Sequence, residues 1–205
     1  MALCAPWTRW WGRLQVEGLE ALPRSGPVLL AGNHDSNRAP VAVGVAARGH
    51  RQVRALAKAS LWSVKPLAPI LTGMGQIPID RGKGDVHALD RAVEALREGA
   101  CIGIFPEGTR SLGRELRARG GIGRLAEAVP ETEIVLVSNT GTTDYARFPK
   151  RPRARVRFSR PAAGGYAIGE DHGEFAARLL EELRTAAPIA AAGRARRASA
   201  SPPAR

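Results

Sequence analysis

A histidine among small polar residues, in the run Asn33-His34-Asp35-Ser36, is the clearest candidate for acid–base chemistry in this chain of 205 residues. It comes at the end of the apolar run 27–33, which is predicted to be a buried strand. An imidazole held in a polar turn at a strand end exchanges its proton near neutral pH and can act as a general base. His34 is therefore the candidate catalytic residue, and a loop histidine that is only solvated is the alternative interpretation.

Arg81 and Lys83 form a second cluster, in a loop that contains Gly82 and leaves the predicted strand 75–79. Two cations beside the free backbone amides of a glycine loop suit the binding of a phosphate group. An exposed basic loop with no ligand has the same composition, so this cluster alone does not identify a site.

The densest polar cluster runs from Phe105 to Ser111, directly after the predicted buried strand 100–105. Its glycine, Gly108, lets a ligand approach the backbone closely, and Thr109 and Arg110 can bind hydroxyl groups or oxyanions. A dense polar run at this point contributes little to core packing. The third cluster therefore predicts a binding site more specifically than the other two.

The elements that must position these clusters alternate between strand and helix along the chain. Strands are predicted at 14–18, 27–33, 53–57, 75–79, 100–105, 133–138 and 154–158. Helices are predicted at 40–49, between the N-cap Asp85 and Gly99, at 116–129 with a break at its glycines, and after Asp171, which has capping-box spacing to Glu174. This order predicts an α/β fold, with one domain over residues 14–185 in which helices flank a mixed, mostly parallel sheet. The polar clusters would then follow strand ends, where such folds place their sites.

The first residues contain three tryptophans at helical spacing. Trp7, Trp10, Trp11 and Leu14 share one face of a helix, so residues 1–13 are predicted to form an amphipathic segment. Tryptophan with arginine is typical of a membrane interface. Tryptophans that cap the core of the domain would show the same spacing, and both interpretations remain open.

The charge balance indicates an anionic partner. There are 31 basic and 19 acidic residues, a net charge of +12, and the last segment, 186–205, contains no acidic residue and is predicted to be a disordered basic tail. A nucleic acid, an anionic membrane or a phosphorylated substrate fits this charge, as does a bias toward arginine. Aromatic residues are only 5% and none is interleaved with a basic stripe, which argues against nucleic acid.

Two isolated cysteines, Cys4 and Cys101, fit a reducing compartment and form no metal motif. The sequence has no apolar stretch of the roughly 18 to 20 residues that a spanning helix needs. These observations predict an intracellular protein.

In order and spacing, the three clusters resemble the motifs of the glycerol-phosphate and lysophosphatidic-acid acyltransferases, a membrane-associated superfamily. Asn33-His34 with Ser36 is similar to the first motif, Ile77 to Arg81 is similar to the second, and Phe105 to Ser111 matches the third without change. The resemblance covers roughly Leu14 to Phe158. The third motif is the most specific of the three.

The resemblance implies an acyltransferase-like fold and a function in phospholipid biosynthesis. A fatty acyl group would pass from acyl-CoA or acyl carrier protein to the hydroxyl of a lysophosphatidic-acid-like acceptor, without a metal or other cofactor. By the resemblance His34 is the base and the acceptor site consists of Arg81, Glu107, Gly108, Thr109 and Arg110, to which Lys83 is added on its charge and position. The expected partners are the thioester donor, the lysophospholipid and an anionic membrane surface, with no nucleic acid. We therefore expect a cytoplasmic protein held peripherally on the inner face of the cell membrane.

The first motif departs from the family pattern at one position. The family has a histidine, four arbitrary residues and then an aspartate, and this chain has Ala39 at the aspartate position. The resemblance implies that the aspartate orients and polarises the imidazole, which alanine cannot do. Asp35 is adjacent to His34, and the side chains of neighbouring residues seldom face each other. A weakened or silent member that still binds lipid phosphate is therefore the alternative function, and a basic nucleic-acid-binding module is a remote third.

Overall fold

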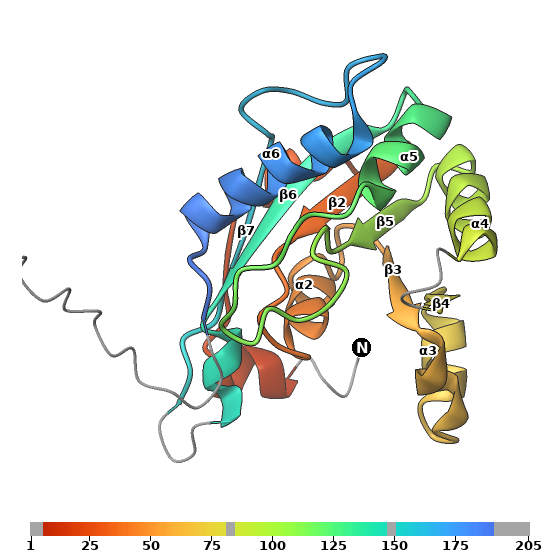
Figure 1. Ribbon diagram of the computed structural model, residues 1–205. Helices are drawn as coiled ribbons and strands as arrows, with labels where there is room; N and C mark the ends of the chain where they lie inside the picture. The colour runs from red at the N-terminus through yellow and green to blue at the C-terminus, as the bar shows by residue number, and fades with distance from the viewer. Residues whose placement is uncertain (1–5, 81–84, 147–150, 191–205) are drawn as a thin grey trace, which may run out of the picture.

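All seven predicted strands form, and they pair in one sheet (Figure 1). The computed structural model describes residues 6–80, 85–146 and 151–190, and over these residues the strand order is β1-β7-β6-β2-β5-β3-β4. Neighbouring strands are parallel except for the antiparallel pair of β6 and β7. The strands are β1 (Gln15–Glu17), β2 (Val28–Gly32), β3 (Val53–Lys58), β4 (Ile77–Ile79), β5 (Cys101–Ile104), β6 (Glu133–Thr140) and β7 (Arg155–Ser159).

Helices cover both faces of this sheet (Figure 1). The longer ones are α2 (Ala39–Ala46), α4 (Val86–Arg97), α5 (Gly121–Ala128) and α6 (His172–Ala186). Short helical segments are η1 (Trp7–Trp11), η2 (Leu19–Ala21), η3 (Ala59–Ser63), α3 (Ala68–Gly73) and η4 (Thr142–Ala146). The predicted fold class, an α/β domain with a mostly parallel sheet flanked by helices, is confirmed.

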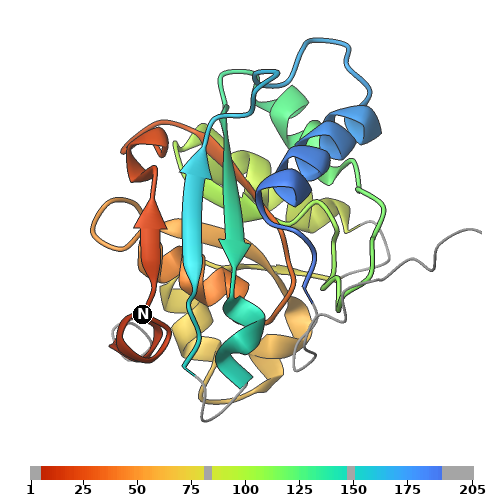
Figure 2. The same ribbon diagram turned by 90° about the vertical axis from the view of Figure 1, so that its left-hand side faces the viewer.

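The central strand β2 divides the core into two layers because successive side chains point to opposite faces. Leu29 and Ala31 pack with the side chains of α4, α5 and α6. Val28 and Leu30 pack with α2 on the other face, where Phe158 of β7 joins them. Figure 2 shows β7 beside β6, and α6 crosses the sheet next to them. With both faces covered, β2 is buried along its whole length and holds the residues that follow it in place.

Two aspartates begin the helices that the sequence assigned to them. The Asp85 carboxylate accepts a hydrogen bond from the backbone N–H of Ala88 at 3.0 Å, and that of Asp171 accepts from Gly173 and Glu174 at 2.8 and 3.0 Å. These bonds satisfy amide groups that the first helical turn leaves unpaired.

The helix predicted at 116–129, with a break at its glycines, forms only on the far side of that break, because α5 begins at Gly121. Two consecutive glycines make continuation of the helix unfavourable at this point. The Arg119 N–H instead donates to the carbonyl of Pro106 at 2.8 Å, which holds the preceding residues as a loop beside the third polar cluster.

The amphipathic N-terminal helix is also shorter than predicted. The turn η1 ends at Trp11, so Leu14 lies outside it and does not extend the tryptophan face. Residues 1–5 of that segment and 191–205 of the basic tail lie outside the described residues.

The cap of α6 gives a direct test of the fold. Asp171→Ala removes the acceptor for two backbone amides, and we expect a loss of about 1 kcal/mol in the free energy of unfolding. For a chain of this size that corresponds to a melting temperature lower by about 2 to 4 °C, measurable by differential scanning calorimetry. Asp171→Asn keeps an acceptor oxygen and should stay close to the parent. Equal losses in the two variants would contradict the role of the cap.

Candidate active site

The three polar clusters follow β2, β4 and β5, at the carboxyl ends of parallel strands. Strands β2 and β5 are hydrogen-bonded neighbours, with Ala31 opposite Ile104 in the register. The first and third clusters therefore begin side by side. The second cluster follows β4 at the edge of the sheet, and its Arg81 and Lys83 lie outside the described residues.

Three hydrogen bonds join the first cluster to the third. The backbone N–H of His34 donates to a carboxylate oxygen of Glu107 at 3.0 Å, and the Ser111 N–H donates to the His34 carbonyl, also at 3.0 Å. The Ser111 hydroxyl donates to the Asp35 carboxylate at 2.6 Å. The backbone of His34 is therefore held on both sides by residues of the third cluster.

Asn33 fastens the same loop to β6. Its side-chain carbonyl accepts from the Asn139 N–H at 2.7 Å, and its amide donates to the Asn139 carbonyl at 2.9 Å. The Asn33 side chain thus imitates a strand neighbour just beyond the end of β2. The sequence placed Asn33 in the first cluster but gave no signal for this role, because the partner is 106 residues away.

The imidazole of His34 lies against the ring of Phe105, with ring centroids 4.3 Å apart. His34 is only 4% exposed, yet it lines an apolar groove of about 780 Å³. A histidine that is packed on one face and open to a cavity on the other is suited to take a proton from a bound substrate.

The apolar groove runs from His34 between α2, β3 and the segment η3–α3. Its lining is mostly aliphatic, with Val43, Leu67, Leu71 and Met74 among the contributors, and Arg110 also borders it. Its dimensions and apolar walls suit a hydrocarbon chain.

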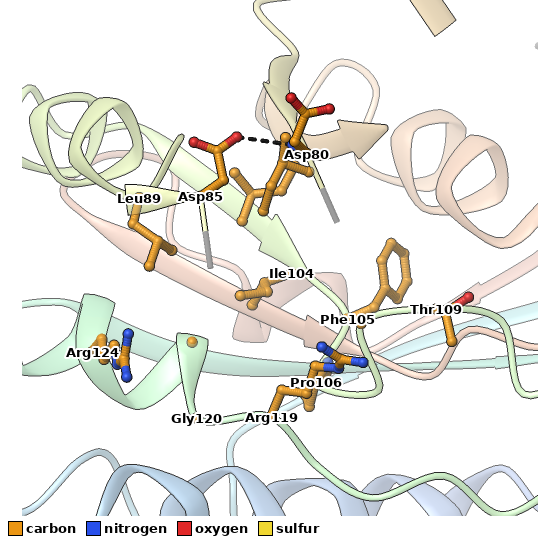
Figure 3. Close-up of a pocket in the computed structure, with 14 residues that line it drawn as sticks. Asp80, Asp85, Leu89, Ile104, Phe105, Pro106, Thr109, Arg119, Gly120 and Arg124 are labelled. Carbon is orange, nitrogen blue, oxygen red and sulfur yellow. Dashed lines mark hydrogen bonds between the residues drawn. The ribbon is translucent and has the colours of Figure 1, made fainter. Parts of the chain in front are cut away.

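A second pocket of about 560 Å³ lies between the starts of α4 and α5 (Figure 3) and has much aliphatic wall; it is called here the polar pocket because four charged side chains border it. Asp80 and Asp85 lie on one side of this pocket, and Arg119 and Arg124 lie on the other. Hydrogen bonds from the backbone of Asp80 and Ala88 hold the pKa of the Asp85 carboxyl below its ordinary value. The two arginines form no ion pair within the described residues, so their charges are available to an anion.

Phe105 and Thr109 line both cavities. Phe105, on whose ring His34 stacks, therefore lies at the border of the two cavities. Two substrates, one held in each cavity, would approach each other beside His34.

Arg119 lies against the turn of the third cluster. A side chain at Gly108 would meet the Arg119 Cδ and Nε atoms at 2.7 and 2.8 Å, and the φ of Gly108 is +69°. Only glycine combines this backbone with so close a neighbour. Sequence reasoning missed Arg119 because it placed the residue inside a helix.

Glu107 occupies a different place from the rest of the third cluster. It is 3% exposed and bonds to the backbone of His34, whereas Gly108 and Thr109 line the polar pocket. Burial raises the pKa of the Glu107 carboxyl, and the nearby Asp35 raises it further. Glu107 thus holds the backbone of the His34 loop from the buried side.

Asp35 is likewise directed into the protein. Its carboxylate accepts from Ser111 at 2.6 Å and from the Asn33 side chain at 3.3 Å. Burial raises the pKa of this carboxyl despite these bonds and one from the Ala190 backbone. Asp35 therefore ties the two clusters together, and Ala39, fully buried at the start of α2, carries no group that could orient an imidazole.

The tryptophans of η1 have unequal surroundings. Trp7 packs on Tyr145 with ring centroids 4.8 Å apart, whereas Trp10 is 73% exposed. The Arg151 guanidinium lies over the Trp10 ring at 4.7 Å. Trp7 thus joins the domain and Trp10 faces outward, and the membrane-interface interpretation of the segment stays a prediction.

Neither a metal cluster nor a spanning helix is found in the part of the chain that the structure describes. No group of three or more His, Cys, Asp and Glu side chains gathers there to ligate a metal. None of the helices there has the length and apolar character needed to cross a bilayer.

Comparison with known proteins identifies relatives of one kind. The sequence model of the acyltransferase family matches residues 13–140. A 1-acyl-sn-glycerol-3-phosphate acyltransferase of Borreliella burgdorferi is 33% identical over 107 residues, 51% of this chain and 42% of that protein. The enzyme of the same name from Bacillus subtilis is 28% identical over 100 residues, 49% of this chain and 50% of that protein. The chain thus matches half or less of the length of these relatives.

A solved structure has the same fold. The 1-acyl-sn-glycerophosphate acyltransferase PlsC of Thermotoga maritima superposes with a TM-score of 0.64, over 88% of this chain and 72% of that one, at 20% identity. At this identity the likeness establishes the fold.

The buried carboxyl of Glu107 makes stability depend on pH. Its pKa is raised above the ordinary 4.5, so the folded protein binds more protons than the unfolded chain at pH values just above 4.5. The free energy of unfolding therefore falls as the pH rises through this window. Glu107→Gln removes the charge and keeps an acceptor for the His34 N–H, so we expect the variant to gain stability relative to the parent as the pH rises.

Urea denaturation at several pH values from 4.5 to neutrality measures this difference. Glu131→Gln, at an exposed carboxyl, is the matched control and should follow the parent. A difference between Glu107→Gln and the parent that does not change with pH would contradict a buried, ionising Glu107.

Proposed function

This chain belongs to the acyltransferase family, and on that premise we propose that it transfers a fatty acyl group from a thioester donor to the hydroxyl of a lysophosphatidic-acid-like acceptor in phospholipid biosynthesis. The observation that carries the proposal is the meeting of an apolar groove and a polar pocket at Phe105, on which His34 stacks. A hydrocarbon chain and a phosphate-bearing headgroup need cavities of these two kinds.

His34 acts in this proposal as the general base. Its imidazole takes the proton of the acceptor hydroxyl, and the hydroxyl oxygen attacks the thioester carbonyl. The carbon–sulfur bond then breaks, and the leaving thiolate receives the proton from the imidazolium. No metal or other cofactor is needed for this transfer.

The acceptor phosphate binds in the polar pocket. Gly108 and Thr109 line that pocket, and Asp80, which also lines it, directly precedes Arg81 in the chain. Arg81 and Lys83 are assigned to the phosphate by the family motif and by their charge. Arg119 and Arg124 extend this set, since both guanidinium groups border the pocket without an ion-pair partner among the described residues.

The donor places its acyl chain in the apolar groove. Arg110, which the family resemblance assigns to the acceptor site, borders the groove together with Lys58. In this proposal both offer positive charge to the phosphates of acyl-CoA or of an acyl carrier protein. The net charge of +12 also favours anionic membranes, and we propose peripheral attachment on the cytoplasmic face of the cell membrane.

A silent lipid-phosphate-binding protein is the second candidate, and Ala39 is the observation that favours it. The family aspartate is absent at this position, and the Asp35 carboxylate is engaged with Ser111 and Asn33. In a serine hydrolase, replacing the orienting aspartate by asparagine lowers turnover about 10⁴-fold. The chain as it stands should therefore be a slow acyltransferase.

The two candidates separate in a comparison of four proteins: the parent, His34→Ala, Ala39→Asp and the double variant. We expect Ala39→Asp to increase thioester consumption by at least about tenfold with a lysophosphatidic acceptor, because a carboxylate is restored to the orienting position. Both proteins that carry His34→Ala should be inactive. Strong parent activity that survives His34→Ala would refute the base assignment, and no gain from Ala39→Asp would favour the silent protein.

Arg119 provides a separate test of the acceptor site. Arg119→Gln removes one charge-assisted contact to the phosphate, worth about 1.5 to 3 kcal/mol, so KM for the acceptor should rise roughly ten- to hundredfold. The donor KM should change little. Arg117→Gln, at an exposed arginine two residues away, is the matched control. An unchanged acceptor KM in Arg119→Gln would exclude this residue from the phosphate site.

A further inference from the structure

The segment between β3 and β4 is apolar, and yet it has no core of its own. It consists of η3, α3 and their connection, residues 59–73, called here the η3–α3 lip. No side chain of η3 or α3 is buried, although both helices contain large apolar residues. Leu61, Val64 and Ile70 are 37%, 48% and 47% exposed. The lip projects beyond β3 and β4 at one end of the molecule (Figure 1).

The two sides of the lip have different neighbours. Leu67 and Leu71 line the apolar groove, whereas Val64 and Ile70 do not and face outward. The Trp62 indole N–H donates to the Thr72 hydroxyl at 3.1 Å, which braces η3 against α3. The lip is therefore a folded structure whose outer apolar side is uncovered.

The chain segment that contains the lip is basic. From Ser36 to Ile79 the chain contains no aspartate or glutamate, and the charged residues of this stretch are Arg38, Arg48, Arg51, Arg54, Lys58 and Lys65. Lysine on an apolar surface lays its methylene chain along that surface and keeps its ammonium group at the polar boundary. An exposed apolar surface that carries Lys65, in a basic segment of the chain, suits the interface of an anionic bilayer.

The N-terminal turn lies at the same end of the molecule as the lip in both views (Figures 1 and 2). This turn carries the exposed Trp10, a residue type enriched at membrane interfaces. A flat membrane surface can therefore contact the N-terminal turn and the lip at the same time, whereas a small protein partner would cover only one of them.

We propose that the outer side of the η3–α3 lip, with Val64 and Ile70, inserts into the surface of an anionic bilayer. The inner side of the lip forms one wall of the apolar groove, so the groove then opens toward the acyl chains of the lipids. The role given to the groove rests on the proposed acyl transfer, but insertion of the lip does not.

The test uses the full chain and sedimentation with vesicles of phosphatidylglycerol and phosphatidylcholine. The double variant Val64→Asp/Ile70→Asp should lower the partition coefficient at least about tenfold, because two apolar contacts are replaced by charges that anionic lipid repels. The matched control is Ile168→Asp, since Ile168 is 97% exposed in the loop between β7 and α6 at the opposite end. The control should bind like the parent, and circular dichroism should show all the proteins folded.

Several results would overturn the proposal. Unchanged vesicle binding in the double variant would do so, as would a parent that does not bind anionic vesicles. Loss of binding in Trp10→Ala together with full binding in the double variant would assign the membrane contact to the N-terminal turn alone. If the parent is a dimer in analytical ultracentrifugation and the double variant is a monomer, the outer side of the lip contacts a second copy of this chain and not a membrane.

A second measurement separates this proposal from the proposed function. With a short-chain thioester and a short-chain acceptor, both water-soluble, the double variant should turn over at the parent rate. Turnover below the parent rate with these substrates would place Val64 and Ile70 in the groove and overturn the assignment of the outer side. If none of these proteins transfers an acyl group although the double variant still loses vesicle binding, the proposed function is wrong, and the membrane contact of the lip is supported.

Discussion

The hydrogen bond from the His34 N–H to the buried carboxylate of Glu107, 3.0 Å long, is the contact on which the site depends. It exists because β2 and β5 are parallel neighbours, so the loops that follow them begin at the same edge of the sheet. With the histidine backbone fixed there, the imidazole stacks on Phe105 and faces the apolar groove. The turn at Gly108 then brings Thr109 to both cavities.

This arrangement has a cost in stability. Burial raises the pKa of both Asp35 and Glu107, so each ionised carboxylate is less stable inside the folded protein than in water. Hydrogen bonds from Ser111 and from the His34 backbone offset part of this cost. The two buried acids therefore hold the loops around His34 in position, and they add little to the stability of the fold.

Charge and apolar surface are distributed unevenly around the same histidine. The stretch 36–79, which supplies α2, β3 and the η3–α3 lip, has no acidic residue, whereas α4 and α6 carry several. The walls of the apolar groove come mostly from that stretch. The basic segment of the chain thus also builds most of the groove that His34 lines. The fold, and not the net charge of +12, decides on which side of the molecule the cations gather.

The sequence by itself determined the strands, the two aspartate caps, the fold class and the three clusters that follow strand ends. These features depend on residues within a few positions of one another. Only the tertiary structure decided that Glu107 turns inward, that Arg119 reaches the polar pocket and that residues 59–73 fold without a core of their own. The direction of a loop side chain depends on partners that are distant in sequence. The Glu107 carboxylate, for example, accepts from a backbone amide 73 residues away, and no local pattern of residue types encodes such a bond.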